Sequence, residues 1–306
     1  MLVANKPNTH GGPGVVACQG GSAKSFLGHW PFDAVRAEML FTSIERVLDR
    51  HGTVVLSSEG FGRWFYEANP EVLSILQDLA LRHEVKVAYY VRPQHTNLES
   101  AWRQWGFRAG GRPSEFVLER VPSLDHTIAL DHVRDVAPRI SFVVRPFRRD
   151  LLIDGDVIID FAATFLGVPD LEPPSEDRDN VGFSLELVNM LRHAPADLFW
   201  TSPHDNRMLS QLRRMGAAEW PIAESSKSRE SRVLLQAFCH HKYEQGNQQL
   251  IRCFDWHTDH FVPPVPGFTC TSVDVTELDR LWEPDATESE LELLFYALSA
   301  LLESIP

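Results

Sequence analysis

The stretch that most constrains the fold is residues 85–107, VKVAYYVRPQHTNLESAWRQWGF, in which an apolar strand passes within a few residues into a helix. The β-branched and aromatic run up to Val91 is typical of a buried strand. Pro93 ends it, because proline lacks an amide proton and fixes φ. A second such run, Thr53–Leu56, comes earlier, and Asn69-Pro70 begins a helix between the two. The stretch therefore predicts parallel strands joined by a crossover helix.

The helix after the second strand is expected to begin near Thr96, because Thr96 and Glu99 have the spacing of a capping box. Arg92 would then lie at the carboxyl end of a strand, and Ser100 in the first turn of the next helix. Open α/β sheets bind ligands at that edge, and a guanidinium with a hydroxyl can hold a phosphate there. The pair predicts an anion site, although a surface arginine and a helix serine without a ligand would give the same pattern.

A further strand is expected over residues 139–146, RISFVVRP, and basic residues mark its end. Arg145 and Arg148 could clamp an anion there, or they could form a solvated turn offset by nearby aspartates. Residues 154–167, DGDVIIDFAATFLG, predict a capped helix that stops at Gly167.

The spacing of Arg92 and Ser100 after an apolar strand resembles the segment of PAPS-dependent sulfotransferases that binds the 3′-phosphate of the sulfate donor. The segments VVLSSEGF, YVRPQHTNLESAWRQWGFRAG and VVRPFRRDLLIDGDVIIDFAATFLGV are similar to bacterial sulfotransferase-like proteins, over residues 53–168. The resemblance implies a P-loop NTPase-like fold, which is a three-layer parallel sheet flanked by helices. It also implies PAPS or PAP as the bound nucleotide, and sulfuryl transfer to a hydroxyl or amine of a small-molecule or carbohydrate acceptor.

The resemblance implies roles for particular residues. Arg92 and Ser100 would hold the donor 3′-phosphate, and Glu59 would be the base that removes the acceptor proton. A carboxylate that caps the following turn or pairs with Arg63 is the equal alternative for Glu59, and Ser57 and Ser58 are weaker candidates.

Substrate contacts are expected from a second, weaker set of residues. Arg145, Arg148 and His126 belong to it, and His132 is a further candidate. The alternative for the two histidines is that they are ordinary exposed side chains.

The phosphate-binding loop with which the family normally begins is not found. Gly20–Ser25, GGSAKS, ends in Lys-Ser but lacks the glycine spacing of G-x-x-x-x-G-K-[ST]. We expect residues 1–31 to be a flexible lead-in, and the chain to enter the fold after the P-loop unit, as a truncated protein or as one that has lost donor binding. Two other functions stay open: a non-catalytic relic that acts through a protein partner, and another P-loop-type phosphotransferase.

Residues 32–306 are expected to form a single α/β domain, incomplete at its amino-terminal side. Residues 168–180, which are acidic and rich in proline, are the best linker candidate. From about residue 181 the apolar spacing is mainly helical, which predicts a helical carboxyl-terminal extension. Thr287 and Glu290 form a second capping-box pattern at the start of its last helix.

Charge and composition exclude several classes of protein. The net charge of −13 argues against a general nucleic-acid binder. No apolar run approaches the roughly 20 residues that span a bilayer, so a cytoplasmic protein without membrane contact is expected. The four cysteines do not suggest a disulfide framework. No metal site is expected, because the histidines and cysteines between residues 239 and 260 lack the usual zinc-ligand spacing.

Overall fold

The structure is a computed structural model that describes residues 2–5, 14–18, 34–56, 65–67, 70–108, 111–172, 182–194, 207–256, 261 and 273–303. The chain divides into two compact units, both discontinuous in sequence. Unit 1 consists of Met1–Arg92, Ser123–Ser175 and Gln245–His260, and unit 2 of Pro93–Pro122, Glu176–Glu244 and Phe261–Pro306. The fold is α/β, as the sequence predicts, and most of its described elements are helices. The expectation that residues 32–306 form a single domain stays a prediction.

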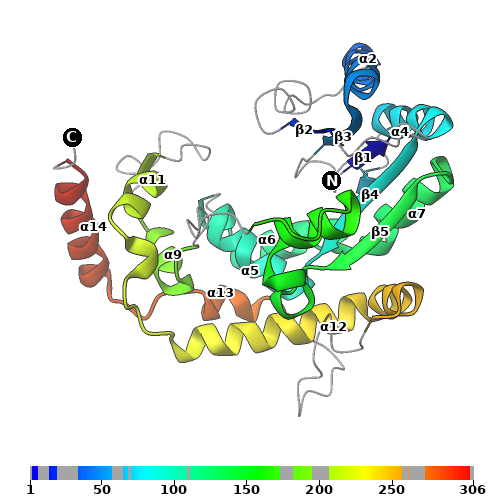
Figure 1. The fold of residues 1–306 in the computed structure, drawn as a ribbon. Coiled ribbons are helices and arrows are strands. Elements are labelled where there is room, and N and C mark those ends of the chain that lie inside the picture. Colours follow the sequence, from blue (N-terminus) through cyan, green and yellow to red (C-terminus); the bar gives the residue numbers. More distant parts are fainter. Residues whose placement is uncertain are drawn as a thin grey trace. The chain divides into compact units, whose positions relative to one another are not determined.

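The five described strands form one sheet in the order β2-β3-β1-β4-β5 (Figure 1). They are β1 (Leu2–Asn5), β2 (Gly14–Cys18), β3 (Gly52–Leu56), β4 (Glu84–Val91) and β5 (Ser141–Pro146). Strand β2 pairs in parallel with β3, and β4 with β5, whereas β1 is antiparallel to both β3 and β4. Strands β2, β3, β4 and β5 therefore run in one direction, and their carboxyl ends lie at the same edge of the sheet.

The sheet corrects two expectations. It is mixed rather than wholly parallel, because β1 lies antiparallel between β3 and β4. The first 31 residues, expected to be a flexible lead-in, contain two strands. Both strands are too short to give a clear local signal, since four or five residues of strand have little alternation to detect.

Side chains alternate between the two faces of the sheet, as the period of two requires. On one face, alternate residues of β3 and β4 pack with α2 (Ala34–His51), α4 (Pro70–Arg82) and α7 (His126–Val136). On the other face, Val55 and Ala88 pack with Phe161 and Phe165. Both faces of the sheet in unit 1 are thus buried against helices.

The helix after β5 begins later than predicted and changes its pitch. Helix α8 (Val157–Phe161) starts after Asp156, whose carboxylate accepts hydrogen bonds from two amides of the first turn. Asp154–Gly155 lie outside it because both residues have positive φ. The helix continues as a π-helix, Ala162–Leu166, and ends at Gly167, whose φ of 68° confirms the predicted stop.

Unit 2 has helices and no strand among its described residues. The helices are α5 (Gln94–Gln104), α6 (Pro113–Arg120), α9 (Leu185–Leu191), α11 (Arg207–Arg214), α13 (Glu277–Leu281), α14 (Glu288–Glu303) and most of α12 (Ser226–Phe254), which continues into unit 1. Short 3-10 segments cover Gly106–Arg108, Pro122–Leu124, Arg149–Leu151, Ile153–Gly155 and Ala217–Glu219 along the chain.

Two tryptophans form the centre of unit 2. Trp102 and Trp282 are fully buried, and their rings stack with centroids 4.9 Å apart. Phe116 meets Trp102 edge-on. Gly106 permits this packing, since a Cβ at that position would lie only 2.4 Å from the Trp102 ring.

Helix α5 begins at Gln94, two residues before the expected position. Pro93 is its N-cap, and no side chain caps the first turn. The Thr96 hydroxyl instead donates to the Pro93 carbonyl at 2.8 Å, and Glu99 binds two arginines. The predicted capping box is therefore wrong, and Ser100 lies in the second turn of the helix rather than the first.

The same sequence pattern is a true capping box at the start of α14. The Thr287 amide donates to Glu290 Oε2 at 2.7 Å, and the Glu290 amide donates to Thr287 Oγ1 at 3.3 Å. This prediction is confirmed. Among the described residues, no helix is both long enough and apolar enough to cross a membrane.

Candidate functional site

The candidate site begins at the carboxyl end of β4, where Arg92 follows the last residue of the strand. Its guanidinium lies over the ring of Phe147, 4.9 Å from the centroid. The Phe147 amide donates to the Val91 carbonyl at 2.8 Å, which extends the pairing of β4 with β5. Arg92 is half-buried and is held at this edge of the sheet by an aromatic face.

A buried carboxylate sits beside this edge. Asp160 has no exposed surface and accepts hydrogen bonds from Tyr90 Oη at 2.7 Å and from Arg145 Nε at 2.6 Å. Arg145 Nη2 binds the other carboxylate oxygen, which also accepts from the Ile153 amide at 3.1 Å. Tyr90 and Arg145 are register partners on β4 and β5, so one carboxylate joins both strands to α8.

The cluster keeps the phenol of Tyr90 neutral. Burial, then the hydrogen bond and the charge of Asp160, raise the pKa of Tyr90 well above its usual range, so the phenol stays protonated and donates. The positive charge of Arg145 is compensated by Asp160, and this ion pair connects β5 to α8. Its predicted role in substrate binding stays a prediction.

Arg148 makes a different kind of pair. It binds Asp150 through Nε, at 3.1 Å, and through Nη2, and the Asp150 side chain is 60% exposed. The Arg148 side chain is half-buried, but water screens the exposed carboxylate of Asp150, so an incoming anion can compete with Asp150 for the guanidinium. Arg148 is thus chemically suited to bind an anion at this edge.

His126 lies on the opposite face of the sheet and is not an exposed side chain. It is 7% exposed, and its Nδ1 accepts a hydrogen bond from Tyr89 Oη at 3.0 Å. Burial lowers the pKa of His126 to about 4, although the Arg92 backbone and the Asp125 charge oppose the shift. Nε2 is buried without a hydrogen bond of good geometry. His126 is a neutral core residue, and the expectation of exposure is wrong.

The structure describes two of the remaining predicted residues, His132 and Ser100, but not Glu59. His132 is half-buried, and its Nδ1 donates to the Phe65 carbonyl at 3.0 Å. Ser100 is half-buried on α5, in unit 2, whereas Arg92 belongs to unit 1. Glu59, with Ser57 and Ser58, lies outside the described residues, as do the segments Gly20–Ser25 and 173–180.

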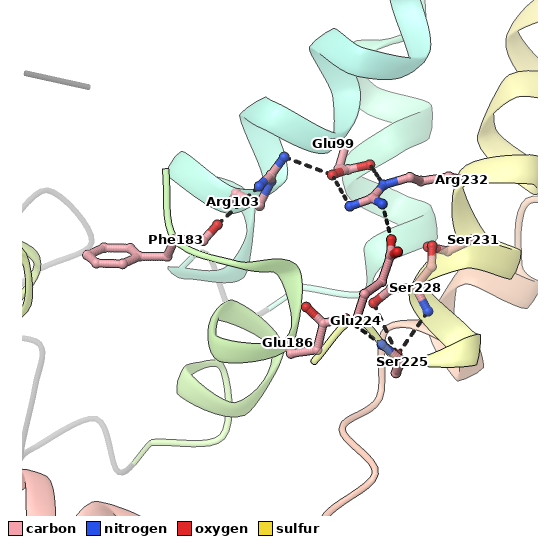
Figure 2. A network of polar contacts seen from close by, with 9 residues as sticks. All are labelled: Glu99, Arg103, Phe183, Glu186, Glu224, Ser225, Ser228, Ser231 and Arg232. Carbon is pink, nitrogen blue, oxygen red and sulfur yellow. Dashed lines mark hydrogen bonds and ion pairs between the residues drawn. The ribbon is translucent and has the colours of Figure 1, made fainter. Parts of the chain in front are cut away.

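Sequence reasoning missed the polar network of unit 2 that Figure 2 shows. Glu99, 7% exposed, binds Arg232 through two hydrogen bonds of 2.8 and 3.2 Å and forms an ion pair with Arg103 at 2.8 Å. Arg232 also binds Glu224, and Arg103 donates to the Phe183 carbonyl. The spacing of Glu99 and Arg103 was a local signal, but Arg232 comes 133 residues later and gave none.

A second part of the same network surrounds the start of α12. The amide of Ser225 donates to Glu186 Oε1 at 2.9 Å, and the Ser225 hydroxyl accepts from the Ser228 amide at 3.0 Å (Figure 2). These bonds give Ser225 the part of an N-cap for α12. Within the described residues, no cluster of three or more histidine, cysteine or acidic side chains is arranged to hold a metal ion.

Comparison of the chain with protein-family models, with curated proteins and with solved structures gives no match. At the carboxyl edge of the sheet lie a half-buried arginine on an aromatic ring, a second half-buried arginine paired with an exposed aspartate, and a neutral phenol. Such an edge can bind an anion.

Proposed function

We propose that the chain is a sulfotransferase-like protein that transfers a sulfuryl group from PAPS to a hydroxyl or amine, on a small molecule or a carbohydrate. The observation that carries the proposal is the common direction of β2, β3, β4 and β5. Their carboxyl ends share the edge at which α/β sheets bind ligands. The segments that bear the candidate groups follow these strands in sequence, so they can contribute to one anion site.

Strand β2 supplies support that the sequence alone lacked. It ends at Cys18, two residues before the glycine-rich segment Gly20–Ser25 in the sequence, and pairs in parallel with β3. Phosphate loops take this context, a parallel strand followed by glycines and a lysine, because successive amides and the ammonium surround the phosphate. We include Lys24 in the proposal as a ligand of the 5′-phosphosulfate, and a P-loop NTPase-like layered sheet as its scaffold.

In the proposed reaction the acceptor oxygen or nitrogen attacks the sulfur atom. The bond from sulfur to the bridging oxygen of the donor breaks, and PAP leaves. Glu59 takes the proton of the acceptor, while Arg92 and Ser100 hold the 3′-phosphate. The resemblance assigns these three roles.

Isothermal titration calorimetry of the full chain with PAP tests the donor site. We expect PAP to bind and Arg92→Ala to weaken binding about tenfold or more, because a charge-assisted hydrogen bond is lost. Arg134→Ala, which removes a 59% exposed arginine on α7, is the matched control and leaves binding unchanged. If PAP does not bind, or binds equally to the Arg92 variant, the donor site is refuted.

A transfer assay with labelled PAPS and a panel of carbohydrate, alcohol and amine acceptors tests the reaction. We expect Glu59→Gln to abolish transfer while PAP still binds. PAP binding without transfer to any acceptor would favour the non-catalytic relic, and protection by ATP but not PAP would favour a phosphotransferase.

A further inference from the structure

Unit 2 contains a cavity of about 210 Å³, beside α9, the start of α12 and the segment that follows α13. This volume equals about seven water molecules at ~30 Å³ each. Met190, Ile222 and Leu281 supply apolar walls, and three carboxylates, two serines and one asparagine supply polar groups. A cavity with an apolar lining and a few polar groups is the usual form of a small-molecule site.

The three carboxylates differ in their partners. Glu283 binds Arg192 and His193, both at 3.0 Å, and Asp285 binds Lys227 at 2.5 Å. Glu186 has no ion pair with any described residue and accepts a hydrogen bond from the Ser225 amide (Figure 2). Glu186 therefore brings a negative charge to the cavity, and among the described residues no cation is in direct contact with it.

Glu186 remains ionised at this position. Burial alone raises the pKa of its carboxyl, but hydrogen bonds from the Ser225 amide and the Ser228 hydroxyl outweigh burial and hold the pKa below its ordinary value, with a smaller contribution from the charge of Arg232. Arg232 itself binds Glu99 and Glu224. An ionised carboxylate beside apolar walls favours a cationic ligand.

Asn189 is a second, independent polar group in the lining. It is 3% exposed, and its Oδ1 accepts the hydrogen bond of Trp102 Nε1 at 3.1 Å. Because indole nitrogen can only donate, this bond fixes the orientation of the amide. The amide nitrogen of Asn189 is a donor in the lining of the cavity, which suits a ligand that carries an acceptor.

We propose that this cavity binds a small protonated amine that has a short apolar body and one hydroxyl or carbonyl oxygen. The ammonium group pairs with Glu186, the oxygen accepts from the Asn189 amide, and the apolar body contacts Met190 and Leu281. An anion is disfavoured by the charge of Glu186, because Glu283 and Asp285 are already paired with cations. This site is independent of the proposed sulfuryl transfer.

Calorimetric titration of the full chain with four related compounds tests the inference. They are 2-amino-1-phenylethanol, 2-phenylethylamine without the hydroxyl, 1-phenyl-1,2-ethanediol without the charge, and anionic mandelate. We expect the amino alcohol to bind most tightly, the amine more weakly, and the diol and mandelate about tenfold more weakly or worse. Equal binding of the diol and the amino alcohol, or no binding of either amine, would overturn the proposal.

Substitutions in the cavity test whether the amino alcohol binds there. Glu186→Gln keeps an oxygen for the Ser225 amide but removes the charge, and we expect it to weaken binding of the amino alcohol about tenfold. Glu292→Gln, on the exposed surface of α14, is the matched control with unchanged binding. Ala286→Leu fills the cavity and abolishes binding without a change of charge. Equal affinity in the two glutamine variants would refute the assignment of Glu186.

Discussion

Arg145 and Asp160 form a buried ion pair in which Arg145 Nε lies 2.6 Å from Asp160 Oδ2, and this pair joins strand β5 to helix α8. The carboxylate has no exposed surface, so its charge depends on the guanidinium and on Tyr90 for compensation. A buried carboxylate that loses its cation is left with an uncompensated desolvation cost. The pair therefore governs the stability of this side of unit 1.

Arg145→Gln should lower the free energy of unfolding by about 3–5 kcal/mol, because Asp160 would remain buried without a cation. Urea denaturation measures the change. Arg148→Gln removes a pair whose carboxylate, Asp150, is exposed to solvent, and should cost less than about 1 kcal/mol. Equal losses in the two variants would contradict the difference in burial on which the prediction rests.

Stability should fall as the pH decreases from about 6.5 to about 4, in part because of His126. Its pKa is lowered to about 4 in the folded chain, whereas the unfolded value is near 6.5. The unfolded state therefore binds more protons in this window, and the contribution of His126 to stability is lost as the pH falls through it, up to about 3 kcal/mol.

The contribution of His126 can be isolated with one substitution. His126→Asn keeps an acceptor for Tyr89 Oη but does not titrate, so its denaturation midpoint should depend less on pH between 6.5 and 4 than that of the unmodified chain. His241→Asn, at an exposed position of α12, should leave the pH dependence unchanged.

Glu99 and Arg232 should be energetically coupled. A double-mutant cycle with Glu99→Gln and Arg232→Gln should give a coupling free energy of about 1–3 kcal/mol, since Glu99 is nearly buried and receives two hydrogen bonds from Arg232. The exposed pair Arg112–Glu115, with 3.9 Å between its atoms, should give less than about 0.5 kcal/mol. A coupling free energy of zero between Glu99 and Arg232 would show that this pair does not contribute to the stability of unit 2.

Gly106→Ala should destabilise unit 2 by about 1–3 kcal/mol, because the new methyl group would overlap the buried Trp102 ring and meet Phe116 at 2.9 Å. Gly182→Ala is the control, since nothing lies within 4 Å of the Cβ it would add. Thermal unfolding, followed by the near-ultraviolet circular dichroism of the tryptophans, should show a lower melting temperature for Gly106→Ala and an unchanged one for Gly182→Ala.

Local patterns predicted the elements whose signals are contained in a short stretch. The strand that ends before Arg92, the stop at Gly167 and the capping box of Thr287 and Glu290 all depend on neighbouring residues, and the structure has them. The box of Thr96 and Glu99 has the same spacing and failed. Glu99 binds Arg103 and Arg232 instead of capping the helix, and Arg232 is far away in sequence.

The sequence by itself determined that this chain is an α/β protein with strands that end in basic residues, because period, proline and glycine act over a few positions. Only the tertiary structure decided which charges are paired: Arg145 with Asp160, and Glu99 with Arg232. It decided that His126 is buried, which lowers its pKa and keeps it neutral. It also decided that β1 enters the sheet antiparallel. Burial and strand pairing join residues far apart along the chain, and no local pattern records their partners.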